Sequence, residues 1–493
     1  MEFASWHKRA VQIPWWSSEK VLKVATDCSG IGMPEQALLT LAESRGLNVQ
    51  FAFGSDLMSP CRKWIEAMRP GPVLVDMTAR KFGKGSFTTV SNGNSMTFAR
   101  TALDLDLYVC GFGCSPFTKN GQRRQWQHEH SSTFFASIKT ILRLQPRCFV
   151  LENVLGISNN TSWQVVEQAF SLLAPRYMIH KVRADAKDFG VPQSRPRIFF
   201  IGVRKDMVKP AILEAPEALR QALVERKLAK AQTTAPIYVD FLKERGYPIV
   251  QNKLLTDTEN LDMQCTCGPH AVCKLHTCKC QKCIQFGSHV KACVWRSSVK
   301  TYRIQTRKQR MAYLSLWRKA KQNMKLKSVP DYFHFACRAR LHTASVTSPL
   351  NRCVLKALSE SNDLMNPKTI LRLSKTIGRN SLRNDGIVPT LTNGCLNMFV
   401  PSAARCLTIP QLLCLSGLAP QEHWQAFELA AEVPGTTMAN LIAGTMSLPV
   451  IGCVIATTLS LIGTKVLAVS VQSACSVGLG RPLYADSDLP ESA

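Results

Sequence analysis

The sequence predicts an α/β protein, a doubly wound and mostly parallel sheet with a smaller domain inserted into it. Short apolar segments typical of buried strands alternate with segments of helical periodicity over residues 21–205. The first strand runs through a glycine-rich turn into a helix, which is the opening of a nucleotide-binding type of α/β unit. After about residue 245 the composition changes, and this change indicates a domain boundary.

Length and charge narrow the class of protein. The chain has 493 residues, enough for two or three domains, and its hydrophobic content of 45% indicates a globular protein. The net charge of +27 indicates a polyanionic partner, most simply nucleic acid. Residues 263–330 contain no Asp or Glu while Lys and Arg recur, so we expect this region to face phosphates rather than serve solubility alone.

Cysteine usage and the first residues bear on the compartment. The chain has nineteen cysteines, and its first twenty residues lack an apolar signal core. We therefore expect a reducing compartment, the nucleus if the source is eukaryotic and otherwise the cytoplasm, and no secretion. Residues 449–471 could be mistaken for a membrane span, but Lys465 and several small polar residues interrupt them. We expect a buried helix followed by a strand or loop, and no membrane association.

The expected elements follow the chain in order. We expect strands at residues 21–25, 49–55, 73–75, 103–109, 147–151, 177–182 and 198–203, and helices at 35–45, 131–144 and 161–173.

The first turn and the next two strand ends carry candidate ligand-binding residues. Asp27, Cys28, Gly30 and Gly32 belong to the glycine-rich turn, whose glycines allow the backbone to approach a ligand. Asp56 and Asp76 follow the second and third strands, where a carboxylate can accept hydrogen bonds from ribose hydroxyls. Each acid could instead cap the following helix. For either residue alone, ligand binding and helix capping are about equally well supported. For the set, ligand binding is favoured.

Cys114 is the candidate nucleophile. It follows the expected strand at 103–109 in the loop of residues 110–118, which contains no carboxylate. Arg123 and Arg124 follow soon after, and positive charge favours the thiolate. The alternative is a buried, inert cysteine.

The order of these motifs closely resembles the cytosine-C5 DNA methyltransferase family. That family has a glycine-rich S-adenosylmethionine loop, strand-end acids, a Pro-Cys loop, a Glu-Asn-Val motif and a Gln-x-Arg-x-Arg motif. The last two stand intact here at residues 152–154 and 193–197, and residues 444–450 resemble the final family motif. The resemblance covers about residues 21–205 and 400–460. It implies a class I methyltransferase, Rossmann-like fold and S-adenosylmethionine as cofactor.

The resemblance also implies a set of site residues. The thiolate of Cys114 would add to C6 of a cytosine flipped out of the duplex, and Glu152 would protonate or bind N3. Arg195 and Arg197 would stabilise negative charge on the ring. Asn153 would help hold the nucleophile loop. The implied cofactor-binding residues are Asp27, Cys28, Gly30, Gly32, Asp56, Asp76 and Thr445.

Three positions depart from the family pattern, and two alternatives stay open. Gly113 stands where the family has Pro, Cys28 where it has Phe, and Thr445 where it has Asn. One alternative is a tRNA cytosine-C5 methyltransferase, because a branch of the family that resembles the DNA enzymes acts on tRNA. The other is a catalytically inactive, nucleic-acid-binding relative.

The middle of the chain is where the family keeps its target recognition domain. We expect an N-terminal tail at 1–20, a catalytic domain in two parts at 21–245 and 396–470, a recognition region at 246–395 and a tail at 471–493. One or two structural zinc ions are expected in the recognition region, and a metal-free reduced loop is the alternative. The candidate ligands are Cys265, Cys267, Cys273, Cys278, Cys280, Cys283, Cys293, His270 and His276.

Overall fold

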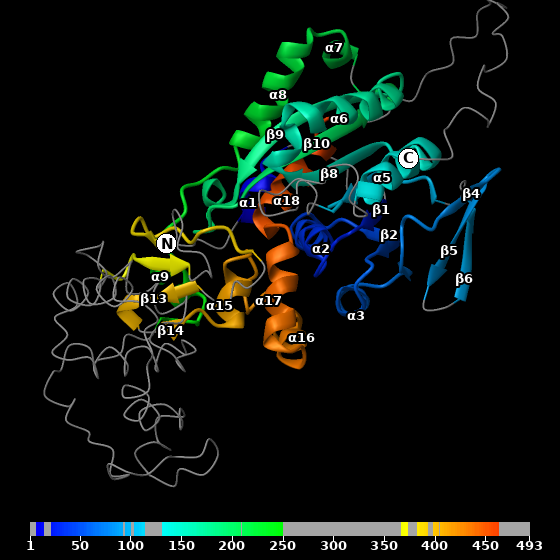
Figure 1. The fold of residues 1–493 in the computed structure, drawn as a ribbon. Coiled ribbons are helices and arrows are strands. Elements are labelled where there is room, and N and C mark those ends of the chain that lie inside the picture. The colour runs from blue at the N-terminus through cyan, green and yellow to red at the C-terminus, as the bar shows by residue number, and fades with distance from the viewer. Residues whose placement is uncertain are drawn as a thin grey trace, which may run out of the picture.

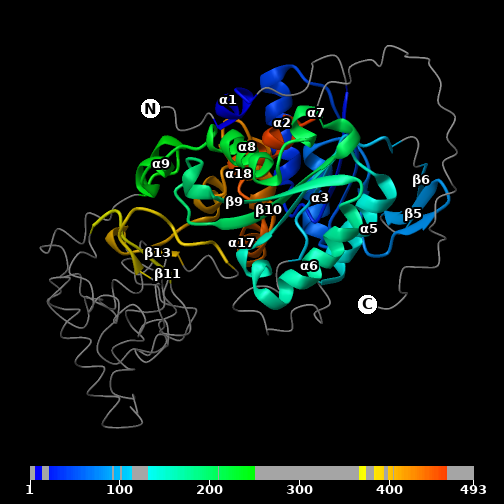
Figure 2. The same cartoon turned by 90° about the horizontal axis from the view of Figure 1, so that it is seen from above.

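A computed structural model gives the fold of the protein (Figures 1 and 2). It describes residues 6–13, 21–91, 94–99, 103–113, 131–208, 210–249, 366–372, 382–392, 398–403 and 405–462.

The central element is a seven-stranded sheet in the order β3-β2-β1-β7-β8-β10-β9. Its strands are β1 (Leu22–Asp27), β2 (Val49–Ser55), β3 (Val73–Leu74), β7 (Leu107–Cys110), β8 (Cys148–Val154), β9 (Tyr177–Asp185) and β10 (Pro196–Arg204). β10 is antiparallel to both β8 and β9, and the other pairs are parallel. The predicted doubly wound, mostly parallel sheet is therefore confirmed, and its strand order reverses between β1 and β7.

Helices cover both faces of this sheet (Figures 1 and 2). One face packs against α1 (Trp6–Val11), α2 (Met33–Arg45), α3 (Ser59–Met68), α8 (Glu217–Ala229) and α18 (Leu448–Leu459). The other packs against α5 (Ser132–Leu144) and α6 (Asn160–Leu173). The remaining helices of the described residues are α7 (Pro210–Leu213), α9 (Tyr238–Glu244), α15 (Ile409–Cys414), α16 (Trp424–Glu432) and α17 (Gly435–Gly444).

α18 is the helix at the centre of the first face. All twelve of its residues are buried, and it contacts α1, α2, α8, β8 and β10. Residues Gly435–Leu459 contain an apolar window long enough to cross a membrane, yet 94% of that window is buried inside the protein. A core helix has this burial, as predicted for the start of segment 449–471. The part beyond Ile462 lies outside the described residues.

The N-terminal segment differs from the expected tail. Residues 6–11 form α1, and the Trp6 ring packs directly on α18, where a Cβ added to Gly452 would lie 2.1 Å from it. The Arg9 side chain donates to the carbonyl of Ala231 (3.1 Å). No local sequence pattern indicates this packing, because Ala231 and Gly452 lie more than 200 residues further along the chain.

Two smaller antiparallel sheets were not expected. β4 (Lys81–Gly83), β5 (Ser86–Ser91) and β6 (Asn94–Ala99) lie between β3 and β7 in the chain. The second sheet contains β11 (Ile370–Arg372), β12 (Leu382–Arg383), β13 (Met398–Val400) and β14 (Arg405–Cys406). This second sheet joins strands from both sides of the expected domain boundary at residues 395 and 396.

Candidate functional site

The site forms where the sheet order reverses, at the carboxyl ends of β1 and β7, the place where open α/β sheets bind ligands. The glycine-rich loop leaves β1 with three left-handed residues, Cys28 (φ 50°), Gly30 (φ 59°) and Gly32 (φ 71°). Glycine takes this conformation without steric cost, which explains two of the three positions. The N–H of Gly111, just after β7, donates to the carbonyl of Asp27 (3.2 Å), so the two loops start side by side.

Asp56 is joined to the glycine-rich loop. Its carboxylate accepts the N–H of Gly30 (3.0 Å) and that of Met58 (2.9 Å). Burial raises the pKa of Asp56, and these backbone N–H groups oppose the shift. By contrast, one oxygen of Asp76 accepts hydrogen bonds from both the N–H (2.8 Å) and the hydroxyl (2.7 Å) of Thr78. These two bonds stabilise a local turn. A ligand role for Asp76 stays a prediction.

Asp27 is engaged within the protein. It is 1% exposed, and its two carboxylate oxygens accept from the guanidinium of Arg80 and from the hydroxyls of Ser55 and Tyr108. These bonds favour a structural role at the end of β1. Direct contact with a cofactor therefore stays a prediction that this network does not support.

Glu152 and Arg197 form an ion pair on neighbouring strands. Glu152 is on β8 and Arg197 on β10, and Nε of Arg197 lies 3.0 Å from Oε1 of Glu152. Both side chains are nearly buried, at 11% and 13% exposure. Burial raises the pKa of Glu152, while the cations of Arg197 and Arg195 act in the opposite direction. A carboxyl group in this setting holds its proton to higher pH than an exposed one.

Asn153 ties this pair to the loop that leads to Cys114. Its Nδ2 donates to the carbonyls of Phe112 (2.9 Å) and Gly113 (3.5 Å). The loop also needs glycine at Gly111, because a Cβ there would lie 2.5 Å from Cε of Met446 and 3.6 Å from Oε2 of Glu152. The start of the loop thus lies against the acid. Cys114 itself lies outside the described residues.

Arg195 has a different set of partners from Arg197. Its guanidinium donates to the carbonyls of Leu391 (3.2 Å), Ala443 (2.9 Å) and Thr445, and it is 4% exposed. These contacts join three distant segments of the chain at the site. We therefore separate the two predicted cations: Arg197 faces the acid, and Arg195 holds the segment that carries Thr445.

Thr445 closes the site opposite the glycine-rich loop. It is 2% exposed, and its Oγ1 has no hydrogen-bond partner in the part of the chain that the structure describes. A Cβ on Gly30 would lie 3.7 Å from this oxygen. The sequence reasoning missed the next residue, Met446, which packs over Gly111. Met446 directly follows Thr445 in the same motif, and this position could have indicated that it belongs to the site.

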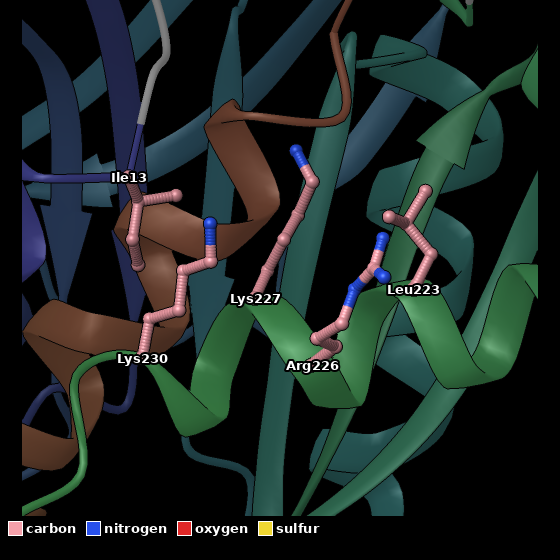
Figure 3. Close-up of a pocket in the computed structure, with 5 residues that line it drawn as sticks. All are labelled: Ile13, Leu223, Arg226, Lys227 and Lys230. Atoms are coloured by element: carbon pink, nitrogen blue, oxygen red, sulfur yellow. The ribbon is translucent and has the colours of Figure 1, made fainter.

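All candidate zinc ligands, and the basic region 263–330, lie outside the described residues. Within the described ranges, no group of three or more His, Cys, Asp or Glu is arranged to hold a metal ion. A hollow of about 490 Å³ is lined by Ile13, by Leu223, Arg226 and Lys227 of α8, and by Lys230, which directly follows α8 (Figure 3). None of these residues belongs to the site.

Comparisons with known proteins give consistent similarities. A family model described as C-5 cytosine-specific DNA methylase matches residues 75–345, just over half of the chain. The orphan methyltransferase M.SPRI of Bacillus phage SPR is 35% identical over 109 residues, 22% of this chain and 24% of that protein. The type II methyltransferase M.BsuFI of Bacillus subtilis is 33% identical over 107 residues, 21% of this chain and 26% of that protein. The matches span about a quarter of the length of these relatives.

Among solved structures, the S. pombe Dnmt2 methyltransferase aligns with 89% of this chain and 98% of its own, with 12% sequence identity and a TM-score of 0.40.

Proposed function

Because this chain belongs to the C-5 cytosine-specific DNA methylase family, we propose that it transfers a methyl group from S-adenosylmethionine to C5 of cytosine in DNA. The observation that supports this activity most directly is the bonding of Asn153 to the carbonyls of Phe112 and Gly113. Through these bonds the start of the nucleophile loop lies beside Glu152, which is paired with Arg197. A nucleophile loop next to a proton-holding carboxyl is the arrangement that addition to a pyrimidine ring requires.

The residues around the glycine-rich loop fit S-adenosylmethionine. Thr445 Oγ1 is a buried hydroxyl oxygen without a partner among the described residues, and it faces Gly30. Asp56, fixed by the Gly30 N–H, is suited to accept hydrogen bonds from ribose hydroxyls. The backbone at Gly30 allows close approach. When bound, the cofactor supplies the electrophilic methyl group that C5 takes up.

The protein's own groups act on the base. The thiolate of Cys114 adds to C6, and Glu152 holds a proton at N3, so that C5 becomes nucleophilic. Arg197, beside Glu152, stabilises the negative charge that develops on the ring. Loss of the C5 proton to a base then allows the Cys114–C6 bond to break and restores the C5–C6 double bond. Arg195 acts as a positioning residue for the Thr445 segment.

The substrate base must leave the duplex to reach such a site. We assign duplex binding to the acid-free basic region 263–330 and one or two structural zinc ions to the cysteine-rich segment within it. The density of thiols in a chain expected to remain reduced supports the zinc assignment. The net charge of +27 supports a polyanionic substrate.

The experiment is transfer of tritiated methyl groups to unmethylated duplex DNA and, in parallel, to bulk tRNA. Replacing the nucleophile in Cys114→Ser should lower transfer to DNA by roughly 10⁴- to 10⁶-fold. Binding of S-adenosylhomocysteine by the variant is the control for folding. A covalent complex with 5-fluorocytosine DNA should form with the wild type and not with the variant.

Two results would contradict the proposal. Label in tRNA alone would change the substrate to RNA. Absence of label in both DNA and tRNA, with folded protein that still binds the duplex, would indicate a non-catalytic relative.

A further inference from the structure

Glu35 is a fully buried carboxylate beneath the glycine-rich loop. It lies in the first turn of α2 and is 0% exposed. Its Oε1 accepts hydrogen bonds from the hydroxyls of Thr26 and Ser29, the latter at 2.9 Å. Thr26 belongs to β1 and Ser29 to the loop, so one carboxylate oxygen connects the strand, the loop and the helix.

The two hydroxyl donors flank the most constrained residue of the loop. Cys28 has a φ of 50°, a left-handed value that is uncommon for a residue with a Cβ. Such backbone persists only where the surroundings hold it. Thr26 and Ser29 are bonded to the same oxygen on either side of Cys28, and this shared bond can hold the turn.

The shape of this loop determines which groups meet at the cofactor side of the site. The Gly30 N–H donates to Asp56 (3.0 Å), and the Gly30 backbone faces the Thr445 hydroxyl. A loop that relaxed around Cys28 would move Gly30 relative to both groups. The loop conformation therefore sets the alignment of Asp56 and Thr445 toward one ligand.

We infer that Glu35 is a positioning residue for S-adenosylmethionine, holding the loop through Thr26 and Ser29. The inference rests on the proposed function. Glu35 acts through the loop and not by contact, because its Oε1 is bonded to protein hydroxyls and its Oε2 is buried near Gly32. Its charge has a counterpart in Arg69: burial lowers the pKa of Arg69, and the charge of Glu35 opposes that shift.

The test is binding of S-adenosylhomocysteine to the full chain by calorimetry, together with steady-state kinetics. Ser29→Ala removes only the loop hydroxyl and should raise the Kd about tenfold, the effect of one hydrogen bond to a charged group. The KM for S-adenosylmethionine should rise in parallel, while kcat at saturating cofactor stays within about twofold. Glu35→Gln, which keeps an acceptor oxygen, should weaken binding less than Glu35→Ala.

Glu43→Gln is the matched control, because Glu43 is an exposed glutamate on the same helix and should bind as the wild type does. Unchanged Kd values in both Ser29→Ala and Glu35→Gln would overturn the inference. So would a loss of kcat with KM unchanged. Absence of S-adenosylhomocysteine binding by the wild-type chain would overturn the proposed function as well. This result is obtained from the wild type alone, so it is distinguishable from a failure of the inference, which is seen in the variants.

Discussion

The two sides of the site differ in how their polar groups are satisfied. We define the base side as Glu152, Asn153, Arg195 and Arg197, and the cofactor side as Gly30, Glu35, Asp56 and Thr445. On the base side, the side chains bond to one another or to backbone carbonyls. On the cofactor side, Thr445 Oγ1 is a buried oxygen without a hydrogen-bond partner in the described part of the chain.

The two sides therefore differ in whether the protein alone, or the protein together with its ligand, satisfies the polar groups of the site. Paired groups cost little reorganisation when a charge develops next to them, so the base side is preorganised by the protein alone. An unpaired buried oxygen is costly until something bonds to it. The cofactor side is therefore the side that should gain most in stability when its ligand binds. The following variants test this contrast.

The largest effect is expected from a variant that lacks the carboxyl proton of Glu152. Glu152→Gln keeps the shape of the side chain but cannot donate a carboxyl proton, so kcat/KM should fall by about 10²- to 10⁴-fold. The Kd for S-adenosylhomocysteine should not change. Glu167→Gln, an exposed glutamate of α6, is the control for both assays. Weakened cofactor binding in Glu152→Gln would show that the two sides are not separable.

Replacing Arg197 should change both the rate and its pH dependence. Burial raises the pKa of Glu152 and Arg197 holds that rise in check, so Arg197→Met should raise the pKa further. The carboxyl then stays protonated to higher pH, and the limb of the profile where activity falls with rising pH should move upward. The rate should fall by about 10²- to 10³-fold, because a charge-stabilising donor is lost.

The measurement is kcat/KM across pH for wild type, Arg197→Met and Arg197→Lys. Lysine keeps the charge, so its limb should lie between the other two. A limb that moved to lower pH in Arg197→Met would contradict the role of the ion pair.

The smallest effect is expected at Thr445, where only one unpaired hydroxyl is removed. Thr445→Val should weaken S-adenosylhomocysteine binding by about three- to tenfold while leaving the unfolding temperature unchanged, since no hydrogen bond within the described protein is lost. Thr458→Val provides the contrast, because Thr458 Oγ1 donates to the Val454 carbonyl (2.8 Å). This second change should cost about 1 kcal/mol of stability without affecting binding. Equal destabilisation of both variants would contradict the assignment.

Local patterns predicted much of the sheet. The strand at residues 49–55 has the same bounds as β2, and the expected helix at 131–144 differs from α5 by one residue. Buried strands are continuous apolar segments, which a single sequence displays well. The sheet of β4 to β6 was missed because its strands are largely exposed and consist mostly of polar residues, with few apolar residues in alternation.

Residue roles were predicted less well where they depend on distant partners. Glu152 and Arg197 belong to intact motifs, and the structure brings them together. Asp27 stands in an equally suggestive motif, but its partner Arg80 lies 53 residues further along the chain. Likewise Arg195 bonds to carbonyls 196 and 248 residues away. Backbone carbonyls occur at every position, so no sequence pattern marks them as partners.

The burial of α18 has a consequence for synthesis on the ribosome. This helix covers one face of the sheet and of α2, yet about 400 residues separate it from α2 in the chain. Translation at roughly 5–20 residues per second requires about 20–80 s to cover that distance. During this interval the apolar surfaces of α2, β8 and β10 that α18 contacts lack this helix. The nascent chain is therefore expected to need a chaperone until α18 emerges.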